Sequence, residues 1–405
     1  MKLQSKRSVK LNIPLLYVIA LSGGLIFWMG IERLFLLSIG GDGFAVSLNA
    51  VVFVAIALSL DIPTGALADK WGRKTMLLIG LTSLFCSSLV YGFSHSPKTY
   101  IFGTVLFALA LATINGAIQA LTYDTLKELD QHKSYSKIYG KLQAALAIGA
   151  GLALLSSGFL AHHFGFRLNF RLALVSSAIA LIISLLLTEP SQHKFGADRP
   201  SLKIAVKQSF ATIRASSLLI ATAVLLLTVR TFQWMSDSYS QLVFNKFGIA
   251  LSWIGVLGFL AVGGGAIGRL VAHRYQGHAR RVVFIMIALF ACAGFAPEPF
   301  ALVGLIGFYG FNQLVENICE TNIQHHLPSH IRATATSVFS FVSTLLLVPF
   351  GLLTGVIIKR YDILMAFRVT AVLGALALAW WVLQNKTELG VKPTGEPLAE
   401  DYQAH

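Results

Sequence analysis

The sequence predicts an all-α integral membrane protein with twelve transmembrane helices in two pseudo-symmetric six-helix halves. Composition predicts the membrane class: of 405 residues, 55% are hydrophobic and only 12% are charged, whereas a soluble domain carries about 25% charged residues. The apolar residues form continuous runs, such as residues 44–60 and 142–160, which approach the roughly 20 residues that cross a bilayer as a helix. Strands of a membrane barrel alternate apolar and polar residues, so spanning strands are excluded.

Six apolar runs are expected to cross the membrane in each half. The first six lie near residues 14–38, 44–66, 75–94, 99–124, 136–161 and 167–188. The second six lie near residues 216–241, 250–272, 281–296, 299–323, 334–358 and 364–384. We therefore expect an N-terminal half at residues 1–188, a cytoplasmic linker at 189–214, a C-terminal half at 215–384 and a cytoplasmic tail at 385–405.

The basic residues indicate topology. The formal net charge of +14 could suggest nucleic acid, but such a partner requires Lys and Arg gathered on a folded surface, and here they fall between apolar runs. Cytoplasmic loops hold the excess of Lys and Arg in membrane proteins, and placing both termini in the cytoplasm puts most loop cations on that side. We expect a multi-pass protein of the plasma (inner) membrane with no nucleic-acid partner.

The two halves resemble each other in order. Phe27-Trp28-Met29 corresponds to Gln233-Trp234-Met235, and Leu67-Ala68-Asp69-Lys70-Trp71 corresponds to Val271-Ala272-His273-Arg274-Tyr275. A third match places Asn115, Gln119 and Tyr123 opposite Asn312, Glu316 and Glu320. The three matches occur in order at a nearly constant offset of about 200 residues, which indicates an internal repeat of the kind found in transporters.

A charged motif follows the second expected span. Gly65-x-x-x-Asp69-x-x-Gly72-Arg73-Lys74 resembles the signature of the loop between spans two and three in the major facilitator superfamily. The resemblance covers the whole chain in architecture and implies the twelve-span fold of that superfamily. It further implies a gating latch, in which Asp69 and Arg73, together with Gly65, Gly72 and Lys74, act with the span-four acid Asp124 to hold the outward-facing state. The alternative is that these charges only anchor helix ends at the membrane surface.

The second copy of this motif departs from the pattern. His273 stands where the first copy has Asp69, and the glycine is displaced to Gly277. An acid that pairs with an arginine is therefore missing from the second loop. We expect asymmetric gating, with the first loop providing the latch.

Ionisable and polar residues inside spans are costly in lipid, so they are expected to face the bundle interior and are candidates for function. Spans one, four, seven and ten line the central cavity in the superfamily, and the resemblance implies that role here. The candidate cavity residues on those four spans are Glu32, Arg33, Asn115, Gln119, Arg230, Trp234, Asp237, Asn312, Glu316 and Glu320.

Depth separates these candidates. At about 1.5 Å per residue, Arg230 lies past the middle of the membrane and Glu316 lies toward the inside. Glu32 and Asp237 lie toward the outer face, where they could pair with Arg230 or with Arg33. Glu32, Asp237 and Glu320 also fit interfacial positions near helix ends.

A carboxylate in a low-dielectric cavity binds a proton more readily, and a neighbouring cation opposes this. Movement that changes burial or the arginine partner would therefore bind and release a proton. We hypothesise that Glu316 carries a coupling proton, with Glu32 or Asp61 as rivals.

The motifs of an ATP-driven pump or a hydrolase are missing from the sequence. Gly72-Arg73-Lys74-Thr75 lacks the spacing of a P-loop, and neither HExxH nor GxSxG occurs. We therefore predict a protein that is not an enzyme and has no cofactor or metal. We expect it to be a monomer and to draw its energy from a proton gradient. The preferred function is efflux of small amphipathic organic compounds. The alternatives are uptake of a small, possibly anionic metabolite with protons, and a receptor that transports nothing.

Overall fold

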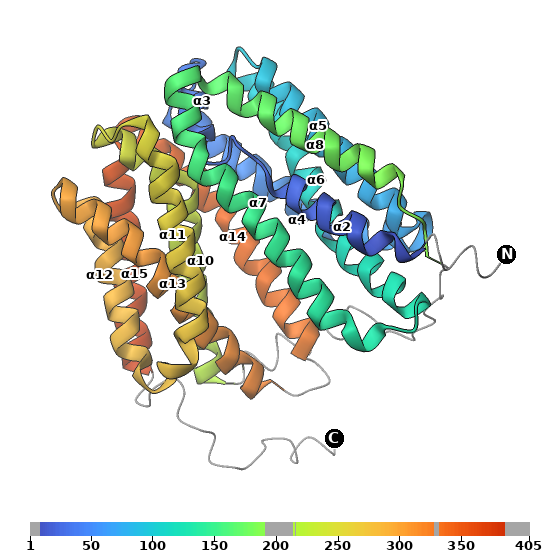
Figure 1. The fold of residues 1–405 in the computed structure, drawn as a ribbon. Helices are drawn as coiled ribbons and strands as arrows, with labels where there is room; N and C mark the ends of the chain where they lie inside the picture. The colour runs from blue at the N-terminus through green and yellow to red at the C-terminus, as the bar shows by residue number, and fades with distance from the viewer. Residues whose placement is uncertain (1–8, 191–213, 215, 328–331, 385–405) are drawn as a thin grey trace, which may run out of the picture. The chain divides into compact units, whose positions relative to one another are not determined.

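A computed structural model describes residues 9–190, 214, 216–327 and 332–384. At Asp61 and Asp69 it describes the backbone and not the side chain, and at Gly65 the backbone alone. The regular elements in these ranges are helices, as Figure 1 shows. The all-α fold predicted from the continuous apolar runs is confirmed.

The first unit of the structure is built from the N-terminal helices, with residues 244–259 and 348–359 attached to it. Its helices are α2 (Asn12–Gly24), α3 (Glu32–Ser38), α4 (Gly43–Trp71), α5 (Arg73–Phe93), α6 (Pro97–Glu128), α7 (Tyr135–Phe164) and α8 (Phe166–Leu185). The last α7 residue is followed by Gly165, whose φ of +80° allows α8 to begin at once.

The second unit is built from the remaining helices, apart from the two attached segments. Its helices are α10 (Ser217–Lys246), α11 (Leu251–Val271), α12 (Ala279–Phe295), α13 (Glu298–His326), α14 (Arg332–Arg360) and α15 (Ile363–Gln384). The expected boundaries of halves, linker and tail stay a prediction.

Ten helices of the described part of the chain are long and apolar enough to cross a membrane. The first and tenth expected spans are outside this group for different physical reasons. The first is interrupted, so that α2 has only 13 residues. The tenth is α13, which has 29 residues but carries the stripe of amides and carboxylates described below.

The expectation of one continuous first helix over residues 14–38 is wrong. The helix stops at Gly24, residues 25–31 are not helical, with turns at 27–31, and a new helix starts at Glu32. Such a break exposes backbone carbonyls that lipid cannot hydrogen-bond. Two side chains of α8 supply the missing donors: Ser176 Oγ donates to the Leu25 carbonyl at 2.9 Å, and Asn169 Nδ2 donates to the Phe27 carbonyl at 2.9 Å.

The break directs Trp28 into the core of the first unit. Its ring is fully buried and lies edge-on to Tyr91 and Phe107, with centroids 4.9 Å apart in both pairs, while Phe170 stacks at 6.1 Å. Edge-to-face and offset stacking are the favoured geometries of aromatic rings. Trp28, which the sequence singles out as part of the internal repeat, is therefore a core residue in this unit.

Aromatic packing also forms the core of the second unit. Phe232 of α10 stacks on Phe290 of α12 at 3.9 Å, and Phe290 contacts Phe308 of α13 and Phe367 of α15 at 5.3 and 5.2 Å. Gly374 allows α15 to approach, because a Cβ there would overlap the Phe232 ring. These rings fix the rotation of α10 and α13, and so fix which of their side chains can meet.

Replacing Asn169 by Ala tests whether α8 supports the break in the first span. The substitution leaves the Phe27 carbonyl without its donor, and it also removes a 2.9 Å bond to the Ser157 carbonyl. Buried acceptors without donors cost about 1–3 kcal/mol, so we expect a lower melting temperature in detergent.

Ser156→Ala is the matched control, since Ser156 is half-buried and its described hydrogen bonds go to carbonyls of its own helix. Equal melting temperatures of the two variants would contradict this account of the break.

Candidate functional site

Gly72 separates α4 from α5 and makes the turn of the charged motif possible. Its φ is +93°, a region that favours glycine because other residues have a Cβ. A Cβ at this position would lie 2.9 Å from the Glu189 carboxyl carbon. The glycine thus serves both the turn and the close approach of an acid.

Glu189 caps the start of α5. Its two carboxylate oxygens accept hydrogen bonds from the backbone N–H groups of Arg73, at 2.6 Å, and Lys74, at 2.7 Å. The first N–H groups of a helix have no partner within the helix and favour a negative charge. The sequence interpretation placed Glu189 at the start of the linker and missed this role; its position as the first acid after the sixth span is the signal that could have indicated it.

Arg73 and Asp124 meet as the motif implied. Arg73 Nε lies 3.6 Å from Asp124 Oδ2, and both side chains are about one-quarter exposed, at 25% and 29%. Lys74 instead donates from Nζ to the Leu185 carbonyl at 2.9 Å. The side chain of Asp69 lies outside the described residues, and the gating role of the set, Gly65 included, stays a prediction.

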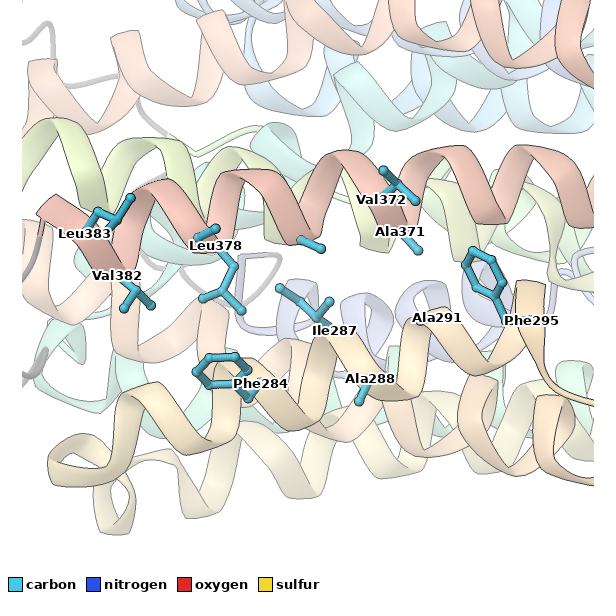
Figure 2. Close-up of a pocket in the computed structure, with 12 residues that line it drawn as sticks. Phe284, Ile287, Ala288, Ala291, Phe295, Ala371, Val372, Leu378, Val382 and Leu383 are labelled. Carbon is cyan, nitrogen blue, oxygen red and sulfur yellow. The ribbon is translucent and has the colours of Figure 1, made fainter.

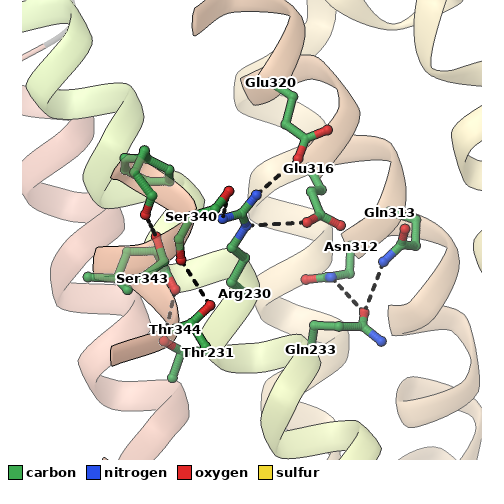
Figure 3. A network of polar contacts seen from close by, with 12 residues as sticks. Arg230, Thr231, Gln233, Asn312, Gln313, Glu316, Glu320, Ser340, Ser343 and Thr344 are labelled. Carbon is green, nitrogen blue, oxygen red and sulfur yellow. Dashed lines mark hydrogen bonds and ion pairs between the residues drawn. The ribbon is translucent and has the colours of Figure 1, made fainter. Parts of the chain in front are cut away.

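Arg230 of α10 is the centre of a polar cluster in the second unit, shown in Figure 3. Its Nε lies 3.5 Å from Glu316 Oε1, and its Nη2 lies 3.1 Å from Glu320 Oε1. Nη1 donates to Ser340 Oγ of α14 at 3.2 Å. One guanidinium therefore connects α10, α13 and α14 through its fork of donors.

Glu316 is held by a second arginine that the sequence interpretation missed. Arg269 of α11 places Nη2 3.7 Å from Glu316 Oε2, so each carboxylate oxygen of Glu316 faces a different guanidinium. Glu316 is 15% exposed and Arg269 is 61% exposed. An arginine near the end of an expected span was the available signal.

The amides beside this cluster form a separate network. Gln233 Oε1 accepts from Asn312 Nδ2 at 2.8 Å and from Gln313 Nε2 at 3.3 Å. Gln233 Nε2 donates to both oxygens of Asp237, at 2.9 and 3.0 Å. Asp237 thus lies two turns beyond Arg230 on α10 and bonds to the Gln233 amide between them, and the suggested pairing of Asp237 with Arg230 stays a prediction.

The remaining cavity candidates are placed as follows. Trp234 lies edge-on to Tyr239, with ring centroids 5.7 Å apart. In the first unit, Glu32 and Arg33 form an ion pair at 3.1 Å with side chains 15% and 12% exposed. Asn115 and Gln119 lie exposed on α6. A single cavity shared by all the candidates stays a prediction.

The second loop differs from the first in structure as well as in sequence. Two short 3₁₀ turns, Ala272–Arg274 and Gln276–His278, connect α11 to α12. His273 Nδ1, in the first of these turns, lies 3.0 Å from the Leu270 carbonyl at the end of α11. Gly277 lacks the positive φ of Gly72.

Replacing Glu189 by Ala tests the cap on α5. Removing an N-terminal cap costs about 0.5–2 kcal/mol, and here two N–H groups lose their acceptor. We expect faster amide hydrogen exchange in the first turn of α5, measured by mass spectrometry on the purified chain. Glu298→Ala is the control, because Glu298 is an exposed acid in the first turn of α13. Unchanged exchange in α5 would show that Glu189 is not a cap.

The fold is similar to that of solved transporters. The crystal structure of the nucleoside transporter NupG superposes with a TM-score of 0.72 at 16% sequence identity, covering 95% of this chain and 99% of that chain. At this identity the similarity shows the fold alone.

Two curated relatives are similar in sequence over part of their length. Multidrug resistance protein 1 of Bacillus subtilis (strain 168) is 26% identical over 227 residues, which are 56% of this chain and 55% of that protein. Tetracycline resistance protein, class H, of Pasteurella multocida is 27% identical over 130 residues, or 32% and 31% of the two chains. The chain spans about half or less of the length of the curated relatives it matches.

The sequence profile described as Major Facilitator Superfamily matches residues 14–351. This range includes the glycine turn at residue 72 and the arginine–carboxylate cluster on α10 and α13. The chain therefore belongs to the Major Facilitator Superfamily.

Proposed function

We propose that this chain is a monomeric secondary active transporter of the plasma (inner) membrane, with both termini cytoplasmic. By alternating access it exports small amphipathic organic compounds in exchange for protons. The observation that carries the proposal is the position of Glu316, an acid within a spanning helix that faces a guanidinium at each of its two oxygens.

The cost of burying charge explains why this position is suited to coupling. A charge inside a membrane needs a partner, and removing one partner leaves the other uncompensated. Protonation of Glu316 removes its negative charge and weakens its attraction to Arg230 and Arg269 together. Since these three residues come from α13, α10 and α11, proton binding alters contacts between three helices at once.

Glu320 gives the cluster a second, more accessible carboxylate. It is 49% exposed and bonds to the same guanidinium as Glu316. A cationic compound that approaches Glu320 competes with Arg230 for its oxygen. This arrangement links substrate binding at Glu320 to Arg230, which also contacts the proton-binding acid Glu316.

The sequence relatives support the direction of transport. The names of two relatives refer to multidrug resistance and tetracycline resistance, functions that efflux would serve. A second candidate is proton-coupled uptake of a small anion, which is favoured by the two arginines at Glu316. Transport assays with cations and anions distinguish the two candidates.

The latch complements this cluster. In the proposed cycle, Arg73 and Asp124 hold one conformation, and Glu189 fixes the start of α5 so that the guanidinium stays aligned. The pair is partly exposed, so its strength is modest and the contact can break when helices move.

Replacing Glu316 by Gln tests the proton role. The amide has the shape of the acid but cannot exchange a proton, so we expect proton-driven accumulation of substrate to fall about tenfold or more while counterflow exchange persists. The assay uses proteoliposomes and a panel of lipophilic cations and organic anions. Glu298→Gln is the control, as an exposed acid at the end of the same helix.

Accumulation unchanged in Glu316→Gln would remove this acid from the mechanism, and Glu32 and Asp61 would be tested in the same way. Movement of organic anions in the same direction as protons would replace the proposal of export by the proposal of uptake. If no compound moves, the chain is a receptor and the transport proposal fails.

A charge exchange tests the latch. Arg73→Asp should lower the transport rate, because it places two acids together, and the double variant Arg73→Asp/Asp124→Arg should restore part of the rate by restoring the attraction. The initial rate of uptake into inverted vesicles measures both. Charges that act only as membrane anchors would show no such rescue.

A further inference from the structure

An apolar groove runs along the second unit between α12 and α15, on a face that the proposed transport mechanism does not use. Its volume is about 630 Å³. Figure 2 shows Phe284 and Leu383 toward one end and Phe295 and Val372 toward the other. The four side chains are 55%, 77%, 58% and 51% exposed, and their helices are of membrane-spanning length and composition.

Small residues create the hollow. Alanines on both helices line the groove between the larger end residues: Ala288, Ala291, Ala371, Ala375 and Ala379. From Phe284 to Phe295 the α12 axis advances by about 16 Å at 1.5 Å per residue. That length is close to one leaflet of a hydrocarbon core of about 30 Å. A single extended hydrocarbon chain from one leaflet fits these dimensions.

An arginine is fixed at one end of the groove. Arg368 is exposed, and its Nε donates to the Gly294 carbonyl of α12 at 2.7 Å. Its guanidinium carbon lies 5.8 Å from the centre of the Phe295 ring, which forms the groove end. Gly294 permits this approach, since a Cβ there would lie 2.9 Å from the Arg368 backbone nitrogen.

The free side of this guanidinium suits a phosphate. Arginine presents several N–H donors in a planar fork that matches phosphate oxygens. Within the described residues, Arg368 donates from Nε to the Gly294 carbonyl and lies over the Phe295 ring, which leaves the two terminal nitrogens for a ligand. These contacts include no carboxylate, so the site offers no partner for a positively charged headgroup amine.

We propose that this groove is a binding site for one anionic phospholipid, with an acyl chain along α12 and α15 and the phosphate at Arg368. The charge of the headgroup complements the arginine, and the chain covers the alanine floor. The site lies on helices of the second unit that contribute no residue to the Arg230 cluster.

The test titrates the full chain, purified in detergent, with phosphatidylglycerol or phosphatidylethanolamine of the same acyl composition. Native mass spectrometry counts the bound lipid. We expect one tightly bound phosphatidylglycerol per chain. Arg368→Gln should weaken its binding about fivefold, the effect of one basic residue near anionic lipid. Ala375→Trp should remove binding by filling the groove.

Two matched variants serve as controls. Arg281→Gln removes an exposed arginine beyond the Phe284 end of the groove, and Leu376→Trp adds the same indole at an exposed position of α15 that does not line it. Both should bind phosphatidylglycerol as the unaltered chain does.

Three results would overturn the proposal. Equal binding of phosphatidylethanolamine would remove the anionic preference. Loss of binding in Arg281→Gln but not in Arg368→Gln would place the headgroup at the opposite end. A dimer that Ala375→Trp converts to a monomer would make the groove an interface between copies. Transport activity is not part of the readout, so the outcome is independent of the proposed function.

Discussion

The need to satisfy every polar group inside an apolar environment is the constraint on which the structure depends. Lipid offers no hydrogen-bond partner, so an exposed carbonyl or an unpaired charge within a span costs several kcal/mol. The hydrogen-bond partners and counter-charges must therefore come from the protein itself. Several polar side chains in the spans, such as Asn169, Arg230 and Glu316, therefore have partners on other helices, and these contacts restrict how the helices can pack.

The two units meet the constraint with different chemistry. In the first, neutral donors of α8 support the carbonyls of a broken helix, and aromatic rings close around Trp28. In the second, opposite charges pair: Arg230 and Arg269 form ion pairs with Glu316. Neutral hydrogen bonds suit a permanent break, whereas a proton can switch a contact between charges. Ion pairs also occur in the first unit, at Glu32–Arg33 and Arg73–Asp124, and the proposed proton coupling is placed at Glu316 because two guanidinium groups face that acid.

The charged motif illustrates how much a local pattern predicts. A turn with a positive φ favours glycine, and Gly72 provides it between the second and third spans. Arg73 lies one residue beyond Gly72, at the edge of a span that the hydropathy already located. A carboxylate at the same end of the fourth span is within reach, so the pairing with Asp124 was predictable. For Glu189 the sequence offers only its position as the first acid after the sixth span; that it caps α5 depends on where a residue more than 100 positions away leaves its helix.

The sequence by itself determined the membrane class, the helical fold, the position of the first charged loop and the polar face of α13, because each depends on composition or on a repeat along one segment. Only the tertiary structure decided that the first span breaks after Gly24, that Arg269 joins Arg230 at Glu316, and that Asp237 turns to Gln233. The reason is physical. A continuous apolar run favours an unbroken helix, and a break is stable only where a neighbouring helix supplies hydrogen-bond donors for the exposed carbonyls. Likewise, the partner of a buried charge depends on helix rotations, which aromatic contacts between distant segments fix.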